Sequence, residues 1–234
     1  MRNIRKIGFG LGLLAFVYSG NLKSNDKIEP ALNTQDSLKY LVDERSGICI
    51  EVTPEKDEQY HNTIREVVAI SGRREELSLL VVKNERKIHL IKSGDVVESH
   101  DVGLGLNPVG AKLWQGDVRT PEGRYEVIEV KDFDNVSRNR YGLALLLNYP
   151  NFHDRKNFDE ALRNNQIPEG VTSPGGDIEI HRGGDYKDWT RGCIAVQLEG
   201  MEPIMRDIEN GATVGIVGYV PFQGEWKIDF NCLD

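Results

Sequence analysis

Short runs of apolar and β-branched residues, separated by turn residues, dominate the chain after residue 76. The first three runs are split only by short polar turns, a pattern that predicts two consecutive hairpins. The expected strands are 77–83, 87–92, 96–102, 124–130, 142–148, 177–181, 193–197 and 213–219. Because these strands do not alternate regularly with helices, the pattern favours a β-rich α+β fold, a mixed sandwich or open barrel with a few short helices.

Helical periodicity is confined to a few stretches. The expected helices are 35–42, 57–70, 158–165 and 201–208. The connections at 103–123 and 149–176 are longer than ordinary loops, which is typical of functional segments. We expect these two connections to form the walls of a substrate groove.

The N-terminus has the layout of a secretory signal. Three basic residues precede an uncharged apolar run, which ends at the small residues Ser19 and Gly20. We expect 1–19 to be an export signal that directs the protein to the periplasm or cell envelope. An uncleaved membrane anchor and a buried helix are the alternatives. The expected organisation after it is a tether and helical segment at 20–76, a domain at 77–220 and an extension at 221–234.

The charge of the chain excludes some classes of partner. The net charge is −8 over 234 residues, and it becomes −11 without the three basic residues of the N-terminal signal. A protein this acidic, with no basic block, is poorly suited to bind nucleic acid or anionic lipid surfaces. We expect a monomer that needs no cofactor.

The sequence contains three cysteines, Cys49, Cys193 and Cys232. In an oxidising compartment an odd number indicates one disulfide and one free thiol. Of the three pairings we favour Cys49 with Cys232, which would tie the N-terminal segment to the end of the chain and leave Cys193 free. Three reduced and buried cysteines are the alternative.

A histidine and a cysteine stand at the ends of two predicted strands. His181 ends the alternating run DIEI, and Cys193 follows Gly192 where a loop enters the next strand. Histidine is the usual base that turns a thiol into a nucleophile. The backbone N–H groups of Arg191, Gly192 and Cys193 are suited to hold an oxyanion. The arrangement predicts a Cys–His site for acyl transfer.

Spacing alone leaves packing or a disulfide as the commoner explanation for such a pair. A metal site is disfavoured, because the paired spacings CxxC and HxxxH are missing. Asp185 and Asp188 in the intervening loop are more often ordinary loop acids than metal ligands. Further motifs are therefore needed to support the catalytic interpretation.

Several motifs in the same order supply that support. A strand ending in histidine, a loop and a Thr-x-Gly-Cys string stand here as IEIHRGG and DWTRGCIAV, and GDVRTPEGRYEV lies upstream at 116–127. These motifs, with the hairpins at 79–105, resemble the L,D-transpeptidase catalytic domain family (YkuD-type). SRNRYGLALLLNYPNFHDRKNF at 137–158 is similar to the YafK-like branch. The resemblance covers residues 77–220.

The resemblance implies an L,D-transpeptidase-like fold and an enzyme that acts on peptidoglycan stem peptides. Cys193 would be the nucleophile and His181 the proton donor and acceptor. Transfer of the acyl group to an amine would form a crosslink or attach a protein to the wall. Transfer to water would make the same site an L,D-carboxypeptidase, or an amidase that releases a wall-attached protein. The alternative from another class is a wall-binding module without catalytic activity.

Three positions depart from the family pattern. Arg182 stands in place of the usual Gly after the histidine, Arg191 in place of a frequent His, and Ala195 in place of an arginine that many members carry. Since arginine offers a planar fork that suits a carboxylate, we expect Arg182 or Arg191 to take over the missing arginine's role. Two solvated surface arginines are the competing interpretation. Thr190 and Trp189 are the other candidate substrate-contacting residues.

Overall fold

A computed structural model describes residues 39–43, 45–74, 76–132, 142–184 and 187–221. The expected signal peptide, the tether and Cys232 lie outside these ranges, so the expectations about them stay predictions. Within the described ranges, no helix is both long enough and apolar enough to cross a membrane.

A closed barrel of eight strands forms the centre of the fold. The strands are β3 (Ser78–Val82), β4 (Lys87–Lys92), β5 (Asp95–Gly103), β6 (Gly123–Asp132), β7 (Leu143–Leu147), β8 (Glu179–Arg182), β9 (Ile194–Val196) and β10 (Thr213–Val217). Their order around the barrel is β10-β3-β4-β5-β9-β8-β7-β6, and pairing of β10 with β6 closes it. The β-rich prediction is confirmed, and the sheet closes into a barrel instead of staying open.

Most neighbouring strands are antiparallel, as the predicted hairpins require. β3, β4 and β5 form the two consecutive hairpins. The pairs β3–β10 and β8–β9 are parallel. Parallel neighbours need a crossover connection, and between β8 and β9 this connection is the loop that leads to Cys193. The parallel pairing therefore brings the ends of the two predicted site strands together.

Alternating apolar side chains fill the barrel interior. The residues buried there include Leu79, Val81, Ile88, Leu90, Val102, Leu104, Tyr125, Val127, Leu145, Ile180, Ile194, Val196, Val214 and Ile216. Burial of each large apolar side chain contributes roughly 1.5–3 kcal/mol. The same alternation leaves every second residue of a strand on the outer face of the barrel.

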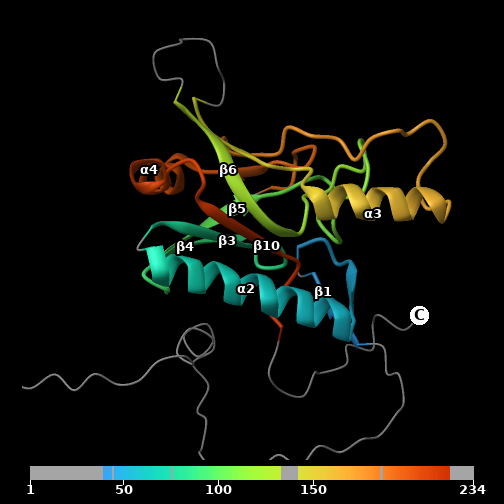
Figure 1. Cartoon of the computed structure of the whole chain (residues 1–234), viewed down its shortest axis with the longest axis horizontal. Helices are drawn as coiled ribbons and strands as arrows, with labels where there is room; N and C mark the ends of the chain where they lie inside the picture. Colours follow the sequence, from blue (N-terminus) through green and yellow to red (C-terminus); the bar gives the residue numbers. More distant parts are fainter. Residues whose placement is uncertain (1–38, 44, 75, 133–141, 185–186, 222–234) are drawn as a thin grey trace, which may run out of the picture. The chain divides into compact units, whose positions relative to one another are not determined.

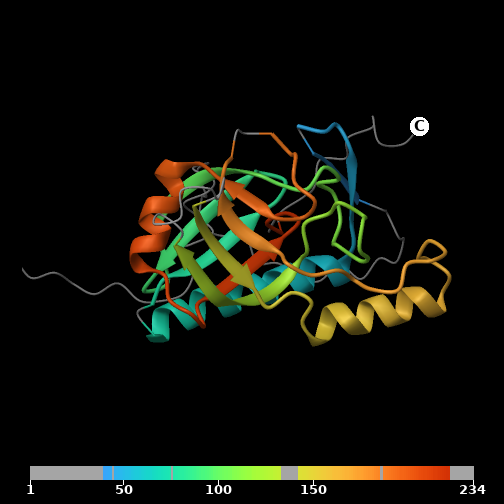
Figure 2. The same cartoon turned by 90° about the horizontal axis from the view of Figure 1, so that it is seen from above.

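Three helices of the described residues lie outside the barrel. α2 (Pro54–Arg74) runs along β3, β4 and β10 (Figure 1) and buries Tyr60 and Val67 in a second apolar cluster. α3 (Phe152–Arg163) and α4 (Leu198–Asp207) lie toward opposite ends of the barrel (Figures 1 and 2). The three helices confirm the predicted helical stretches after residue 56, although all three begin earlier than expected.

The predicted helix at 35–42 is wrong where the structure describes it. Residues Lys39–Val42 form strand β1, which pairs antiparallel with β2 (Cys49–Val52). The turn between the two strands is held by Asp43, whose carboxylate accepts hydrogen bonds from the backbone N–H and the hydroxyl of Ser46, both at 2.8 Å. Pairing with a second strand and burial of Ile50 and Val52 override the short helical pattern.

Candidate active site

The register of β8 and β9 places the predicted histidine and cysteine on one face of the barrel. Ile180 pairs with Ile194, and His181 pairs with Ala195. Because Ile180 and Ile194 point into the barrel, alternation directs His181 and Cys193, the residue before β9, to the outer face. The two residues therefore share one face of two adjacent strands.

His181 is held in a defined orientation and tautomer. Its side chain is 5% exposed and lies between Ala144 and Ala195, whose small side chains leave room for the ring. The indole of Trp189 packs edge-on against the imidazole, with ring centroids 5.9 Å apart. His181 Nδ1 lies 2.9 Å from the carbonyl oxygen of Arg182. Since a carbonyl only accepts, Nδ1 carries a hydrogen, and in the neutral imidazole Nε2 is then the atom with the lone pair that a general base needs.

Cys193 is a free, half-buried thiol. Its Sγ donates a hydrogen bond to the carbonyl oxygen of Asp177 at 3.6 Å. Burial raises the pKa of Cys193, and the carboxylates of Glu179 and Asp177 raise it further, while the backbone N–H of Glu179 and the ammonium of Lys112 act in the opposite direction. The resting group is therefore a protonated thiol, which requires a base to become a nucleophile.

The two acidic neighbours provide a test of this electrostatic description. Asp177→Asn and Glu179→Gln each remove a negative charge near the thiol, so each should lower the pKa of Cys193 and make its alkylation at neutral pH several-fold faster. Asparagine suits position 177, because Asp177 has a positive φ of 54°. Glu160→Gln on the exposed side of α3 is the matched control. Alkylation rates equal to the wild type in both site variants would contradict the description.

A hydrogen-bonded turn fixes the backbone next to the thiol. The hydroxyl of buried Thr190 accepts from the N–H of Gly192 at 3.1 Å and donates to the carbonyl of Cys193 at 2.7 Å. Gly192 has a φ of +136°, and a Cβ on it would lie 2.6 Å from the carbonyl oxygen of Arg119. Thr190 thus stabilises the turn, and the N–H of Gly192 is already used within it.

The remaining predicted substrate-contacting residues differ in their placement. Arg182 and Arg191 are both exposed. Strand alternation puts Arg182 on the opposite face of β8 from His181, whereas Arg191 lies in the turn directly before Gly192 and Cys193. Trp189 is 36% exposed and covers part of the His181 ring. Arg191 and Trp189 therefore stay close to the site, and Arg182 points away from it.

Asp177 and Glu179 lie against the thiol, although the sequence analysis did not single them out. Part of the signal was present in the run DIEIH, where Glu179 and His181 stand on either side of Ile180 and share the outer face of β8. Glu179 also accepts a hydrogen bond of 2.8 Å from Lys131 on β6. An ion pair therefore borders the cysteine on the face that carries the histidine.

Two other predictions concern a disulfide between the remaining cysteines and the lack of a metal site. Cys49, at the start of β2, is disulfide-bonded, while Cys193 is free. Cys232, which we predict as the partner of Cys49, lies outside the described residues. Across the described ranges, no group of three or more His, Cys, Asp or Glu side chains is placed to hold a metal ion.

Comparison with known proteins shows which family the sequence matches. The family model of the L,D-transpeptidase catalytic domain (YkuD), which describes the sequences of that family, matches residues 77–216. Similar solved structures include Bd1075 of Bdellovibrio bacteriovorus, with 23% identity, a TM-score of 0.44, and coverage of 62% of this chain and 49% of that chain. No curated protein matches the chain.

Two further solved structures are L,D-transpeptidases. The one from Xylanimonas cellulosilytica has 12% identity, a TM-score of 0.39, and coverage of 61% of this chain and 60% of that chain. The one from Mycobacterium tuberculosis has 13% identity, a TM-score of 0.38, and coverage of 60% and 57%. The chain thus spans less than two thirds of each of these three proteins. Because the family model matches more than half of its residues, the chain belongs to the L,D-transpeptidase catalytic domain family.

Proposed function

We propose that the protein is a cysteine acyl-transferase that acts on peptidoglycan stem peptides, with Cys193 as nucleophile and His181 as acid and base. The observation that carries the proposal is the shared outer face of β8 and β9, which holds both a free thiol and a histidine whose Nδ1 is hydrogen-bonded to a carbonyl. Membership of the L,D-transpeptidase family supports the choice of substrate class.

The proposed reaction begins with the resting thiol, which donates to the Asp177 carbonyl. The thiol turns to His181, whose Nε2 takes its proton, and the thiolate attacks the carbonyl carbon of the third residue of the stem peptide. A C–S bond forms, and the carbonyl oxygen becomes an oxyanion. Since Gly192 uses its N–H within the turn, the N–H groups of Cys193 and Arg191 are the proposed oxyanion donors.

The second half of the proposed reaction forms the acyl-enzyme and then transfers its acyl group. The C–N bond breaks, and the leaving amine, D-alanine from a tetrapeptide, takes the proton held by His181. An amine or a water then attacks the thioester carbonyl while His181 accepts its proton, the C–S bond breaks, and His181 returns the proton to the thiolate of Cys193. An amine acceptor gives a crosslink or an attached protein. A water acceptor gives a trimmed peptide or a released protein.

We also propose that the protein works in the cell envelope after export. The layout of residues 1–19 supports this location. The disulfide at Cys49 supports it independently, because structural disulfides persist in oxidising compartments and are rare in the cytosol.

The function is tested by the products formed from a disaccharide-tetrapeptide. We expect the wild type to release D-alanine, and chromatography with mass spectrometry then identifies the acceptor. Crosslinked dimers indicate transfer to an amine, and disaccharide-tripeptides indicate hydrolysis. If neither product appears with this substrate or with a wall peptide that carries an attached protein fragment, the enzyme proposal fails and a wall-binding module takes its place.

Arg191 is the arginine that we expect to bind a substrate carboxylate. Arg191→Ala should raise KM about tenfold, the effect of losing one charge-assisted hydrogen bond, and leave the rate of Cys193 alkylation unchanged. Arg182→Ala is the matched control, because Arg182 is equally exposed but lies on the opposite face of β8. Steady-state kinetics that show the same KM for both variants would contradict this assignment.

A further inference from the structure

The turn between β3 and β4 carries two buried cations that reach two different active-site loops. Lys83 is 1% exposed and Arg86 is 0% exposed. A charge buried to this degree requires partners that neutralise it and satisfy its hydrogen bonds. Each of these cations draws one such partner from a loop beside the thiol. Residues 39–74, which precede the part of the chain that the family model matches, contact Arg86 directly through Asp43 and contact Glu122, a partner of Lys83, through Tyr60.

Arg86 connects the β1–β2 hairpin to the loop before the nucleophile. Its guanidinium donates to Asp43 at 2.6 and 3.1 Å and to Asp188 at distances between 2.8 and 3.1 Å. Asp188 immediately precedes Trp189, which packs against the imidazole of His181. The guanidinium thus has a carboxylate on each side, one from the hairpin and one from the active-site loop. Asp43 therefore completes the charge pairing of the guanidinium that binds the residue before Trp189.

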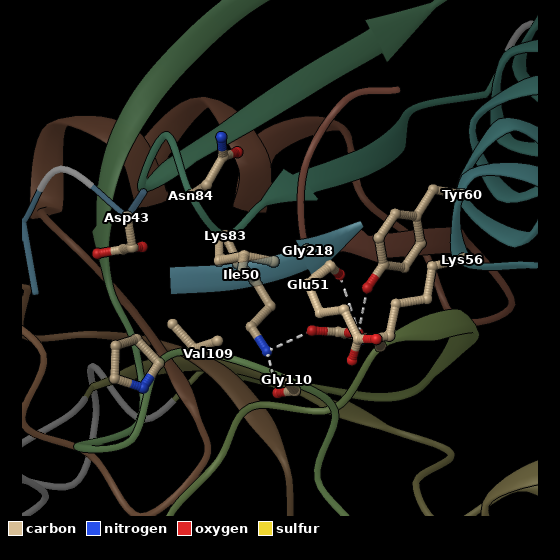
Figure 3. A pocket seen from close by; sticks show the side chains of 12 residues that line it. Asp43, Ile50, Glu51, Lys56, Tyr60, Lys83, Asn84, Val109, Gly110 and Gly218 are labelled. Atoms are coloured by element: carbon tan, nitrogen blue, oxygen red, sulfur yellow. Dashed lines mark hydrogen bonds and ion pairs between the residues drawn. The ribbon is translucent and has the colours of Figure 1, made fainter. Parts of the chain in front are cut away.

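Lys83 binds the other active-site loop, and Glu122 in that loop also contacts α2. Its ammonium donates to the carbonyls of Gly110 at 2.6 Å and Thr120 at 2.9 Å, and to the carboxylate of Glu122 at 2.8 Å. The second oxygen of Glu122 accepts from the hydroxyl of Tyr60 on α2 at 2.5 Å. Figure 3 shows Lys83 and Tyr60 converging on this region from different elements. Lys83 in the β3–β4 turn thus holds both ends of the 110–122 segment, and Tyr60 on α2 also holds the end at Glu122.

The segment that Lys83 holds lies directly against the nucleophile's turn. Arg119 precedes Thr120, and its carbonyl oxygen occupies the place that a Cβ on Gly192 would need. A cavity of about 40 Å³ remains between Lys83, Tyr60 and their neighbours. This volume is far below that of a small-molecule site, roughly 300 Å³ or more. The cluster is therefore suited to support the loops and not to bind a ligand.

We propose that Asp43 and Tyr60 are positioning residues for the Cys193–His181 site, Asp43 acting through Arg86 and Tyr60 through Glu122. Residues 39–74 then form part of the catalytic unit, although they lie before the residues that the family model matches. The inference rests on the proposed function for its effect on turnover. Its effect on the reactivity of the thiol does not depend on the identity of the substrate.

The test compares Asp43→Asn and Tyr60→Phe with Tyr219→Phe in the full chain. Tyr219 is the matched control, because its hydroxyl donates to Asp57 at 2.7 Å and its ring packs on Tyr60, but this bond reaches neither active-site loop. Two quantities are measured: the ratio of the Cys193 alkylation rate at neutral pH to that at alkaline pH, and kcat and KM with a stem peptide. Thermal unfolding verifies that each variant is folded.

We expect the alkylation ratio and kcat to fall between about tenfold and 100-fold in Asp43→Asn and Tyr60→Phe, because a small displacement of the reacting groups is costly. KM should change little, and Tyr219→Phe should leave both quantities near the wild type. Folded Asp43→Asn and Tyr60→Phe proteins with an unchanged ratio and kcat would overturn the proposal, as would an equal loss in Tyr219→Phe.

Two further outcomes are also decisive. If Asp43→Asn does not fold, Tyr60→Phe decides alone, because it removes a single hydroxyl. If the wild type turns over no stem peptide, the proposed function fails. The alkylation ratio then still decides whether Asp43 and Tyr60 position the thiol and the histidine.

Discussion

Cys193→Ala should abolish acyl transfer, lowering turnover of a stem tetrapeptide by at least about 10⁴-fold. The variant removes the only free thiol among the described residues, and with it the atom that we expect to form the thioester. Because Cys193 is half-buried at the surface and its Cβ is retained, the fold should be preserved. Release of D-alanine, followed with purified wild-type and variant protein, measures the effect.

His181→Gln separates the nucleophile from its base. Glutamine is a polar side chain of similar size, but its amide cannot take a proton from the thiol. We expect turnover to fall by about 10²–10⁴-fold while Cys193 remains open to alkylation at alkaline pH. Turnover near the wild-type level in either Cys193→Ala or His181→Gln would contradict the proposed roles.

Gly192→Ala should destabilise the fold and lower turnover. The φ of +136° lies in a region that essentially only glycine adopts, which costs a side chain about 1–3 kcal/mol. The new Cβ would also lie 2.6 Å from the carbonyl oxygen of Arg119. We therefore expect a loss in the free energy of unfolding of about 3 kcal/mol. Turnover should also fall by at least about tenfold, because Cys193 is the next residue.

Gly170→Ala is the control that isolates the steric contact. Gly170 also has a positive φ, +84°, but a Cβ there would meet no atom within 4 Å. Its loss of stability should be limited to the backbone cost of about 1–2 kcal/mol, with normal turnover. Denaturant unfolding of both variants gives the comparison. Equal losses for the two glycines would show that the close approach of Arg119 does not constrain the turn.

The strand pattern predicts more of this site than the spacing of its residues does. Alternation in DIEIH assigns His181 to the face opposite the two isoleucines, and the structure has this arrangement. The same alternation could have identified Glu179 as a neighbour of the thiol. Alternation does not predict the register between two strands. The pairing of His181 with Ala195 depends on the long loop between β8 and β9 and on residues far away in the sequence.

The buried cations were not predictable from local sequence. Lys83 and Arg86 stand in the polar string KNER, which reads as an ordinary solvent-exposed turn. Their burial depends on partners far along the chain, since Arg86 binds one carboxylate 43 residues before it and another 102 residues after it. A single sequence does not show which distant acids will meet a given base.

The prediction of a helix at 35–42 was wrong for a related reason. KYLV is too short for periodicity to distinguish a strand from a helical turn. Its strand form depends on pairing with Cys49–Val52 and on the burial of Ile50 and Val52 beside Tyr60. The YafK-like branch, the pairing of Cys49 with Cys232 and the groove walls stay predictions.

The central claim is that Cys193 forms an acyl-enzyme with a stem peptide. Intact-mass spectrometry of the wild type and Cys193→Ala, each incubated with a disaccharide-tetrapeptide, tests it most directly. We predict that the wild type alone gains the mass of the acyl group while D-alanine is released. A wild type that shows neither adduct nor turnover, or an adduct that also forms on Cys193→Ala, would contradict the account.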